Sequence, residues 1–176
     1  MRFRSISAIT GTALVIAAGL APVAGVTAAE TSPSPWTPYQ GSGFERAAGQ
    51  LCDFALRGEL LSDKERYRVT ETYPDGSTRV EEWTGQLIFR FVNAETGASV
   101  ERNLTGRGDF VYHEDGSWSL VNVGGHIGVG LRPGDDPGMG YYVISGAGYE
   151  LHQDTTGHRT LTPGDGNAEN ICETLS

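Results

Sequence analysis

The amino-acid sequence predicts an all-β protein built from antiparallel hairpins. Apolar and polar residues alternate along much of the chain, which is the period of a half-buried strand, whereas stretches of helical period are scarce. Turn signals rich in Gly, Asp and Pro separate the alternating segments. The third observation is the glycine content: 25 of the 176 residues are glycine, and many of them fall inside the expected strands.

The turns divide the chain into a series of expected strands. They comprise residues 52–57, 65–73, 78–93, 99–113, 118–131, 139–152 and 158–162, with short helical pieces only at 45–50 and 168–175. Because each hairpin folds back after a short turn, the simplest topology is an antiparallel meander. Long twisted strands with joined ends favour closure, since closure removes exposed edges. We therefore expect a small closed up-and-down β-barrel over an open sandwich.

Glycines inside the strands support a strongly curved sheet. A glycine within a strand marks a bend, a bulge or the close approach of another backbone. We interpret these glycines as bending points, and the competing interpretation is a glycine face laid open for a ligand. They are Gly85, Gly106, Gly108, Gly124, Gly125, Gly128, Gly130, Gly146 and Gly148.

The first residues are typical of a secretory signal peptide rather than of the fold. A short basic start at residues 1–4 precedes an apolar stretch at 6–26, and small residues permit cleavage after Ala28 or Ala29. The alternative is an N-terminal membrane anchor. Residues 30–43 are rich in Pro, Ser and Gly and are expected to form a flexible leader. A single β-barrel domain at 44–176 follows, in a protein expected to be secreted and extracellular.

Cys52 and Cys172 lie near the two ends of the expected domain. An exported protein reaches an oxidising compartment, and an even number of cysteines without metal-like spacing predicts a disulfide. Such a bridge requires that the first strand and the C-terminal tail be neighbours.

The charge balance excludes some classes of partner. The net charge of −9 becomes −11 once Arg2 and Arg4 leave with the signal peptide. Nucleic acids and anionic membranes both call for a basic face. We therefore expect no nucleic-acid partner, and no membrane partner after removal of the signal.

Three short stretches carry a family resemblance. They are Cys52-Asp53-Phe54, then Asn93-Ala94-Glu95-Thr96-Gly97-Ala98-Ser99-Val100, and finally Cys172. In these the chain resembles a group of secreted actinobacterial small β-barrel proteins, although Asp53 stands where that pattern has glycine. The resemblance implies a secreted β-barrel and brings no known active site with it.

Polar residues on apolar strand faces are the candidates for a ligand site. Alternation places three polar residues on the same strand faces as apolar residues: Glu71, Arg102 and Ser145. If these faces point inward, the charges of Glu71 and Arg102 need partners. We hypothesise that Glu71, Arg102, Tyr141 and Ser145 form a polar patch in a cavity. The alternative is that a bulge shifts the register and turns both charges to water. His126, among small glycine neighbours, is the best single candidate for acid–base work.

No motif indicates a metal, a cofactor or a catalytic nucleophile. The acidic pair Asp135-Asp136 lacks the spacing of an EF-hand loop and is interpreted, like 165–167, as a solvated turn. The glycine-rich runs lie in strands with no helix following, so they do not form a phosphate-binding loop. We expect no cofactor and no metal.

Three functions remain open from the sequence. The first is a non-catalytic binding module that holds a small apolar ligand in a calycin-like cavity or recognises an extracellular protein or glycan by its loops. The second is a cofactor-free barrel enzyme similar to the dirigent and allene oxide cyclase barrels. The third is an extracellular protease inhibitor that presents residues 132–138.

Overall fold

The computed structural model describes residues 32–176. The expected signal peptide, residues 1–29, lies outside the described residues. Regular structure in the described range is β-strand apart from one short helix, α1 (Ile171–Thr174), which confirms the all-β prediction. No helix of this range has the length and apolar character needed to cross a membrane.

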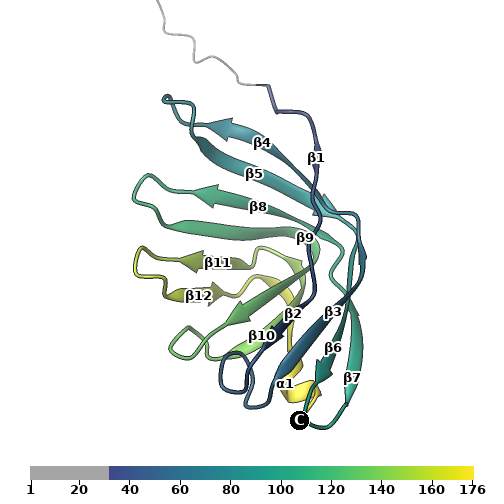
Figure 1. The fold of residues 1–176 in the computed structure, drawn as a ribbon. Coiled ribbons are helices and arrows are strands. Elements are labelled where there is room, and N and C mark those ends of the chain that lie inside the picture. The colour runs from purple at the N-terminus through teal and green to yellow at the C-terminus, as the bar shows by residue number, and fades with distance from the viewer. Residues whose placement is uncertain (1–31) are drawn as a thin grey trace, which may run out of the picture. The chain divides into compact units, whose positions relative to one another are not determined.

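The larger sheet contains nine strands, which pair in antiparallel fashion. The β4–β5, β8–β9 and β11–β12 hairpins extend to the same side in Figure 1. In order across the sheet the strands are β1 (Thr37–Pro38), β4 (Arg66–Thr72), β5 (Thr78–Gly85), β8 (Gly106–Tyr112), β9 (Trp118–Leu131), β10 (Gly140–Ala147) and β13 (Asp165–Asn170). The hairpin of β11 (Glu150–Gln153) and β12 (Arg159–Thr162) joins the sheet where β11 pairs with the first residues of β9.

The smaller sheet contains four strands, and one long hairpin of the chain runs through both sheets. Its order is β2 (Phe44–Arg46), β3 (Leu56–Asp63), β6 (Leu87–Asn93) and β7 (Ser99–Asn103). The strands expected at 78–93 and 99–113 are each divided, so that β5 and β8 lie in the larger sheet and β6 and β7 in the smaller. The long hairpin thus bends from one sheet into the other.

The closed barrel expected from the sequence is not confirmed. Among residues 32–176 neither sheet closes: the pairing ends at β1 and β13 in the larger sheet and at β2 and β7 in the smaller. The antiparallel arrangement itself is confirmed. The difference arises because the 78–113 hairpin changes sheet at its middle instead of continuing around a single wall.

A row of glycines marks that change of sheet. Gly85 lies opposite Gly106, and Gly106 lies opposite Gly125 across β5, β8 and β9. A Cβ atom on Gly106 would lie 2.7 Å from the backbone nitrogen of His126, closer than real side chains approach. The predicted role of these glycines as bending points is confirmed at this row, where the backbones approach too closely for a side chain.

Apolar side chains cover both faces of the β9–β10 pair. Val143 belongs to one core cluster and its neighbour Ile144 to the other, as expected for successive residues of a strand. The first cluster packs β10 and α1 against the smaller sheet through buried residues such as Leu56, Phe91 and Ile171. The second packs the opposite face against the β11–β12 hairpin.

The disulfide joins the two ends of the first core. Cys52 and Cys172 are bonded, which confirms the predicted bridge. The strand expected at 52–57 begins instead at Leu56, because residues 51–54 form bends that bring Cys52 to the tail. The helix expected at 168–175 is limited to α1, since the residues before it pair with β10 as β13. The helical piece expected at 45–50 is replaced by the end of β2 and a turn.

The segment between residues 32 and 43 lies along the edge of the larger sheet. Thr37 and Pro38 form β1, which pairs with β4. Trp36 lies against the guanidinium groups of Arg66 and Arg68, 4.7 and 4.5 Å from its ring centroid. Tyr39 follows in the chain, and the centroid of its ring lies 5.0 Å from the centroid of the Trp83 ring.

Candidate functional site

A cleft of about 300 Å³ opens where the two sheets part, beside the glycine row. Gly106, Gly108 and Gly128 line it. At Gly106 and Gly128 neighbouring atoms already occupy the place of a Cβ atom, so these glycines allow the walls of the hollow to pack closely. The competing interpretation of the glycines, a face open to a ligand, stays a prediction at these positions. The remaining lining is mainly apolar or aromatic: Tyr39, Glu65, Trp83, Thr84, Leu87, Leu104, Phe110, Tyr112, Leu120, His126 and Ile127. We call this hollow the aromatic cleft.

Aromatic rings of three segments stand around this cleft at steep angles. The ring of Tyr39 makes an angle of 72° with that of Trp83, and the ring of Phe110 makes an angle of 63° with it, at a centroid distance of 5.9 Å. Tyr67 stacks on Trp83 at 4.9 Å and supports it. The indole Nε1–H of Trp83 donates to Glu81, which fixes the ring further. The rings are thus held in place by packing.

Glu65 is the acidic residue of the aromatic cleft. It lies in the link between β3 and β4, where its backbone N–H donates to Asp63 at 2.8 Å and its carbonyl accepts from Tyr39 at 2.9 Å. Within the described chain its carboxyl group has no hydrogen-bond or ion-pair partner. Burial, together with the charge of Asp63, raises the pKa of Glu65 to about 7. At neutral pH this carboxyl therefore exists in both its protonated and its ionised form.

The candidate Glu71 lies away from the aromatic cleft. Its side chain is exposed and forms an ion pair with Arg79 at 3.0 Å. The pairing of β4 with β5 shifts register between Val69 and Glu71, so the strand no longer keeps its side chains in phase there. The bulge considered as the alternative from the sequence is therefore present at this residue.

Three of the other candidates lie close together in the fold: Arg102, His126 and Ser145. They line a second, polar hollow of about 230 Å³. His126 and Ser145 are directly opposite across β9 and β10. His126 also lines the aromatic cleft, so it stands between the two hollows.

Arg102 finds its charge partner across the two sheets. Its Nε and Nη2 atoms donate to the two carboxyl oxygens of Glu169 at 2.7 and 2.6 Å. These hydrogen bonds lower the pKa of Glu169 and raise the pKa of Arg102. Because this forked pair already satisfies the guanidinium, Arg102 serves to join β7 to β13.

Tyr141 belongs to the first core rather than to the second hollow. Its ring lies 4.7 Å from that of Phe91 and 5.5 Å from that of Phe44. Burial raises its pKa, and the nearby charge of Glu65 acts in the same direction. A side chain at Gly128 would collide with the Tyr141 hydroxyl, so that hydroxyl reaches the wall of the aromatic cleft.

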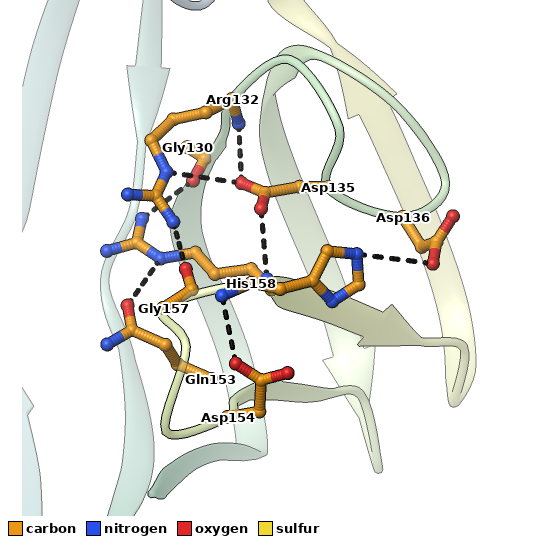
Figure 2. A network of polar contacts seen from close by, with 9 residues as sticks. Gly130, Arg132, Asp135, Asp136, Gln153, Asp154, Gly157 and His158 are labelled. Atoms are coloured by element: carbon orange, nitrogen blue, oxygen red, sulfur yellow. Dashed lines mark hydrogen bonds and ion pairs between the residues drawn. The ribbon is translucent and has the colours of Figure 1, made fainter.

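The loop at residues 132–138 is braced from within (Figure 2). Asp135 is buried and accepts hydrogen bonds from the backbone N–H groups of Arg132 and Arg159 at 2.7 and 2.9 Å. Burial alone would raise its pKa, but these bonds outweigh it and hold the pKa below the ordinary value. The guanidinium of Arg132 donates to the carbonyl of Gly157. The solvated turn expected at Asp135 is therefore wrong, because its carboxylate organises the loop.

The second expected turn, at 165–167, is also wrong, since these residues belong to β13 and pair with β10. The guanidinium of Arg132 braces this loop while its side chain stays 49% exposed, and the protease-inhibitor hypothesis for residues 132–138 stays a prediction. Within residues 32–176 no cluster of three or more metal-ligating side chains is found.

The residue that sequence reasoning missed is Glu65. It shares alternation with Tyr67 and Val69, as Glu71 does, so its position was a usable signal. The fold adds Tyr39, Trp83 and Phe110 around it from segments far apart in the chain.

Comparison of the chain with protein-family models, with curated proteins and with solved structures found no significant match.

Proposed function

We propose that this protein binds a small, largely apolar molecule in the aromatic cleft. The observation that carries the proposal is the lining, in which aromatic and aliphatic side chains surround about 300 Å³ of space. Small-molecule sites are typically apolar hollows of roughly 300–1,000 Å³ with a few polar groups that set orientation. Glu65 and His126 are such groups here.

The disulfide bond fits a secreted carrier. The disulfide indicates an oxidising, extracellular-type environment, and we propose that the protein is secreted and meets its ligand there. A closed barrel is not needed for this function, because the hollow forms where two open sheets part. Recognition of an extracellular protein or glycan by the loops is the alternative, and it predicts no occupant in the cleft.

The described tryptophans offer a direct test by NMR. Trp83 lines the aromatic cleft, whereas Trp36 packs against Arg66 and Arg68 on the other side of β4. Titration of the ¹⁵N-labelled protein with indole, a small apolar probe, should shift the Trp83 side-chain N–H signal and leave that of Trp36 in place. We expect saturation with a Kd of about 1 mM or tighter, which corresponds to roughly 4 kcal/mol of binding free energy.

The proposal fails if indole leaves the Trp83 signal unchanged at millimolar concentration, or if it moves the Trp36 signal instead. Native mass spectrometry of the secreted protein adds an independent observation, since a co-purified small molecule supports a carrier.

A cofactor-free enzyme is the second candidate, favoured by one observation. A carboxyl group with a pKa near 7 in an apolar hollow is suited to general acid–base catalysis, and His126 lines the same hollow. Glu65→Gln separates the two functions once a ligand is known. In an enzyme the variant binds the ligand but leaves it unchanged, whereas in a carrier neither protein alters the ligand.

A further inference from the structure

The rings of the aromatic cleft are arranged to surround a group rather than to stack on a flat one. Tyr39 and Phe110 meet Trp83 in edge-on contacts at 72° and 63°, so three rings in different planes line one hollow. An aromatic face carries partial negative charge, and several faces around one point attract a cation that has lost its water. Quaternary ammonium groups are recognised in this way.

The charges around the same hollow have one sign. Neither lysine nor arginine is among the described residues that line it. Glu65 lines it without a partner for its carboxyl group within the described chain, and Asp63 lies next to Glu65. A half-buried carboxylate without a partner is unfavourable, and either a proton or a bound cation relieves it.

We infer that the molecule bound in the aromatic cleft is an organic ammonium compound whose cationic head lies among the rings of Tyr39, Trp83 and Phe110. The Glu65 carboxylate supplies the opposite charge. This inference rests on the proposed function and adds to it the chemical class of the ligand.

The inference sets the direction of a pH dependence. With the pKa of Glu65 at about 7, a cation binds the ionised form and releases a proton from the protonated form. Affinity for a cation therefore rises between pH 6 and pH 8. A neutral ligand that accepts a hydrogen bond from the protonated carboxyl binds more weakly over the same range. The other titratable groups that border Glu65 or line the hollow are Asp63, Tyr39, Tyr112, His126 and Tyr141, together with the chain neighbours Lys64 and Arg66.

The test compares choline with 3,3-dimethylbutan-1-ol, which has the same shape with carbon in place of the charged nitrogen. Each is titrated at pH 6 and pH 8, with the Trp83 side-chain signal as the readout. At pH 8 we expect choline to bind roughly tenfold more tightly than the neutral compound. The preference should shrink at pH 6.

Matched variants assign the effect to the cleft. Glu65→Gln should abolish both the preference for choline and its pH dependence. Glu71→Gln removes the same charge from an exposed ion pair and should keep both. Tyr39→Leu, in a partly exposed segment, should weaken choline binding more than binding of the neutral compound, and it serves if Glu65→Gln does not fold. His126→Gln should retain the pH dependence if Glu65 is its source.

The outcomes distinguish the two proposals. If the neutral compound binds as tightly as choline at pH 8 while indole still shifts Trp83, the inference of a cationic ligand is wrong and the apolar site stands. If choline, the neutral compound and indole all leave Trp83 unchanged, the proposed function itself is overturned.

Discussion

Gly106 is the residue on which the shape of the cleft depends most directly. It lies between Gly85 and Gly125 in the row where the 78–113 hairpin passes from one sheet to the other. A Cβ atom there would collide with the backbone of His126, so a side chain would force β8 and β9 apart. Gly124, on the adjoining strand, has open space around it and an ordinary φ.

This contrast predicts opposite effects for two Gly→Ala substitutions. Gly106→Ala should lower the free energy of unfolding by about 2 kcal/mol or more, because the backbone contact cannot relax cheaply. Gly124→Ala should be neutral or stabilise by up to about 1 kcal/mol, since it reduces the freedom of the unfolded chain. Urea unfolding of both variants measures this. Equal effects would show that Gly106 is not a point of close backbone approach.

The loop between β9 and β10 shows how one buried side chain organises an element. Both carboxylate oxygens of Asp135 accept backbone hydrogen bonds, one from its own loop and one from β12 (Figure 2). Arg159 adds a hydrogen bond to the carbonyl of Gly130 at 3.0 Å. The loop is therefore tied to the β11–β12 hairpin at several points.

We expect Asp135→Ala to destabilise the protein by about 2–3 kcal/mol, because two partly buried backbone N–H groups lose their acceptor. For a domain of this size the thermal midpoint should fall by roughly 5–10 °C. Asp136→Ala is the matched control, since its side chain is 70% exposed, and it should change stability by less than about 0.5 kcal/mol. Similar midpoints for the two variants in a thermal melt would contradict the role given to Asp135.

The strand β4 illustrates what alternation can and cannot locate. The alternation of apolar and polar side chains in β4 correctly predicts a face with Tyr67 and Val69. The register shift after Val69, however, turns the side chain of Glu71 to solvent. Glu65, which precedes the irregularity, lines the cleft. Alternation is a local property, whereas a bulge depends on how β4 meets β5. For this reason alternation predicts the face and the acidic residues on it, but it does not say which of Glu65 and Glu71 lines the cleft.

At the scale of the whole molecule, the disulfide closes the chain around the first core. The bonded cysteines are 120 positions apart in sequence, and Ile171 and Leu175 are buried beside the bridge. The tail is therefore held by packing as well as by the covalent bond.

Replacement of both Cys52 and Cys172 by alanine should lower the free energy of unfolding by about 2–5 kcal/mol, mainly because the unfolded chain gains freedom. The variant should still fold, since the buried residues of the tail retain their contacts. Urea unfolding, with the reduced wild-type protein as a second comparison, checks both statements. A variant that is as stable as the oxidised protein would contradict the first statement, and a variant without a cooperative unfolding transition would contradict the second.

The all-β class, most of the strand positions, the antiparallel hairpins and the cysteine pair can be predicted from the amino-acid sequence. These follow from short-range properties: the alternation of side chains, the turn residues and the number and placement of cysteines. The division of the long hairpin between two open sheets, and the meeting of Tyr39, Glu65 and Trp83 in one hollow, become visible only in the folded chain. Both depend on close backbone approach and strand register between distant segments, which no local pattern records.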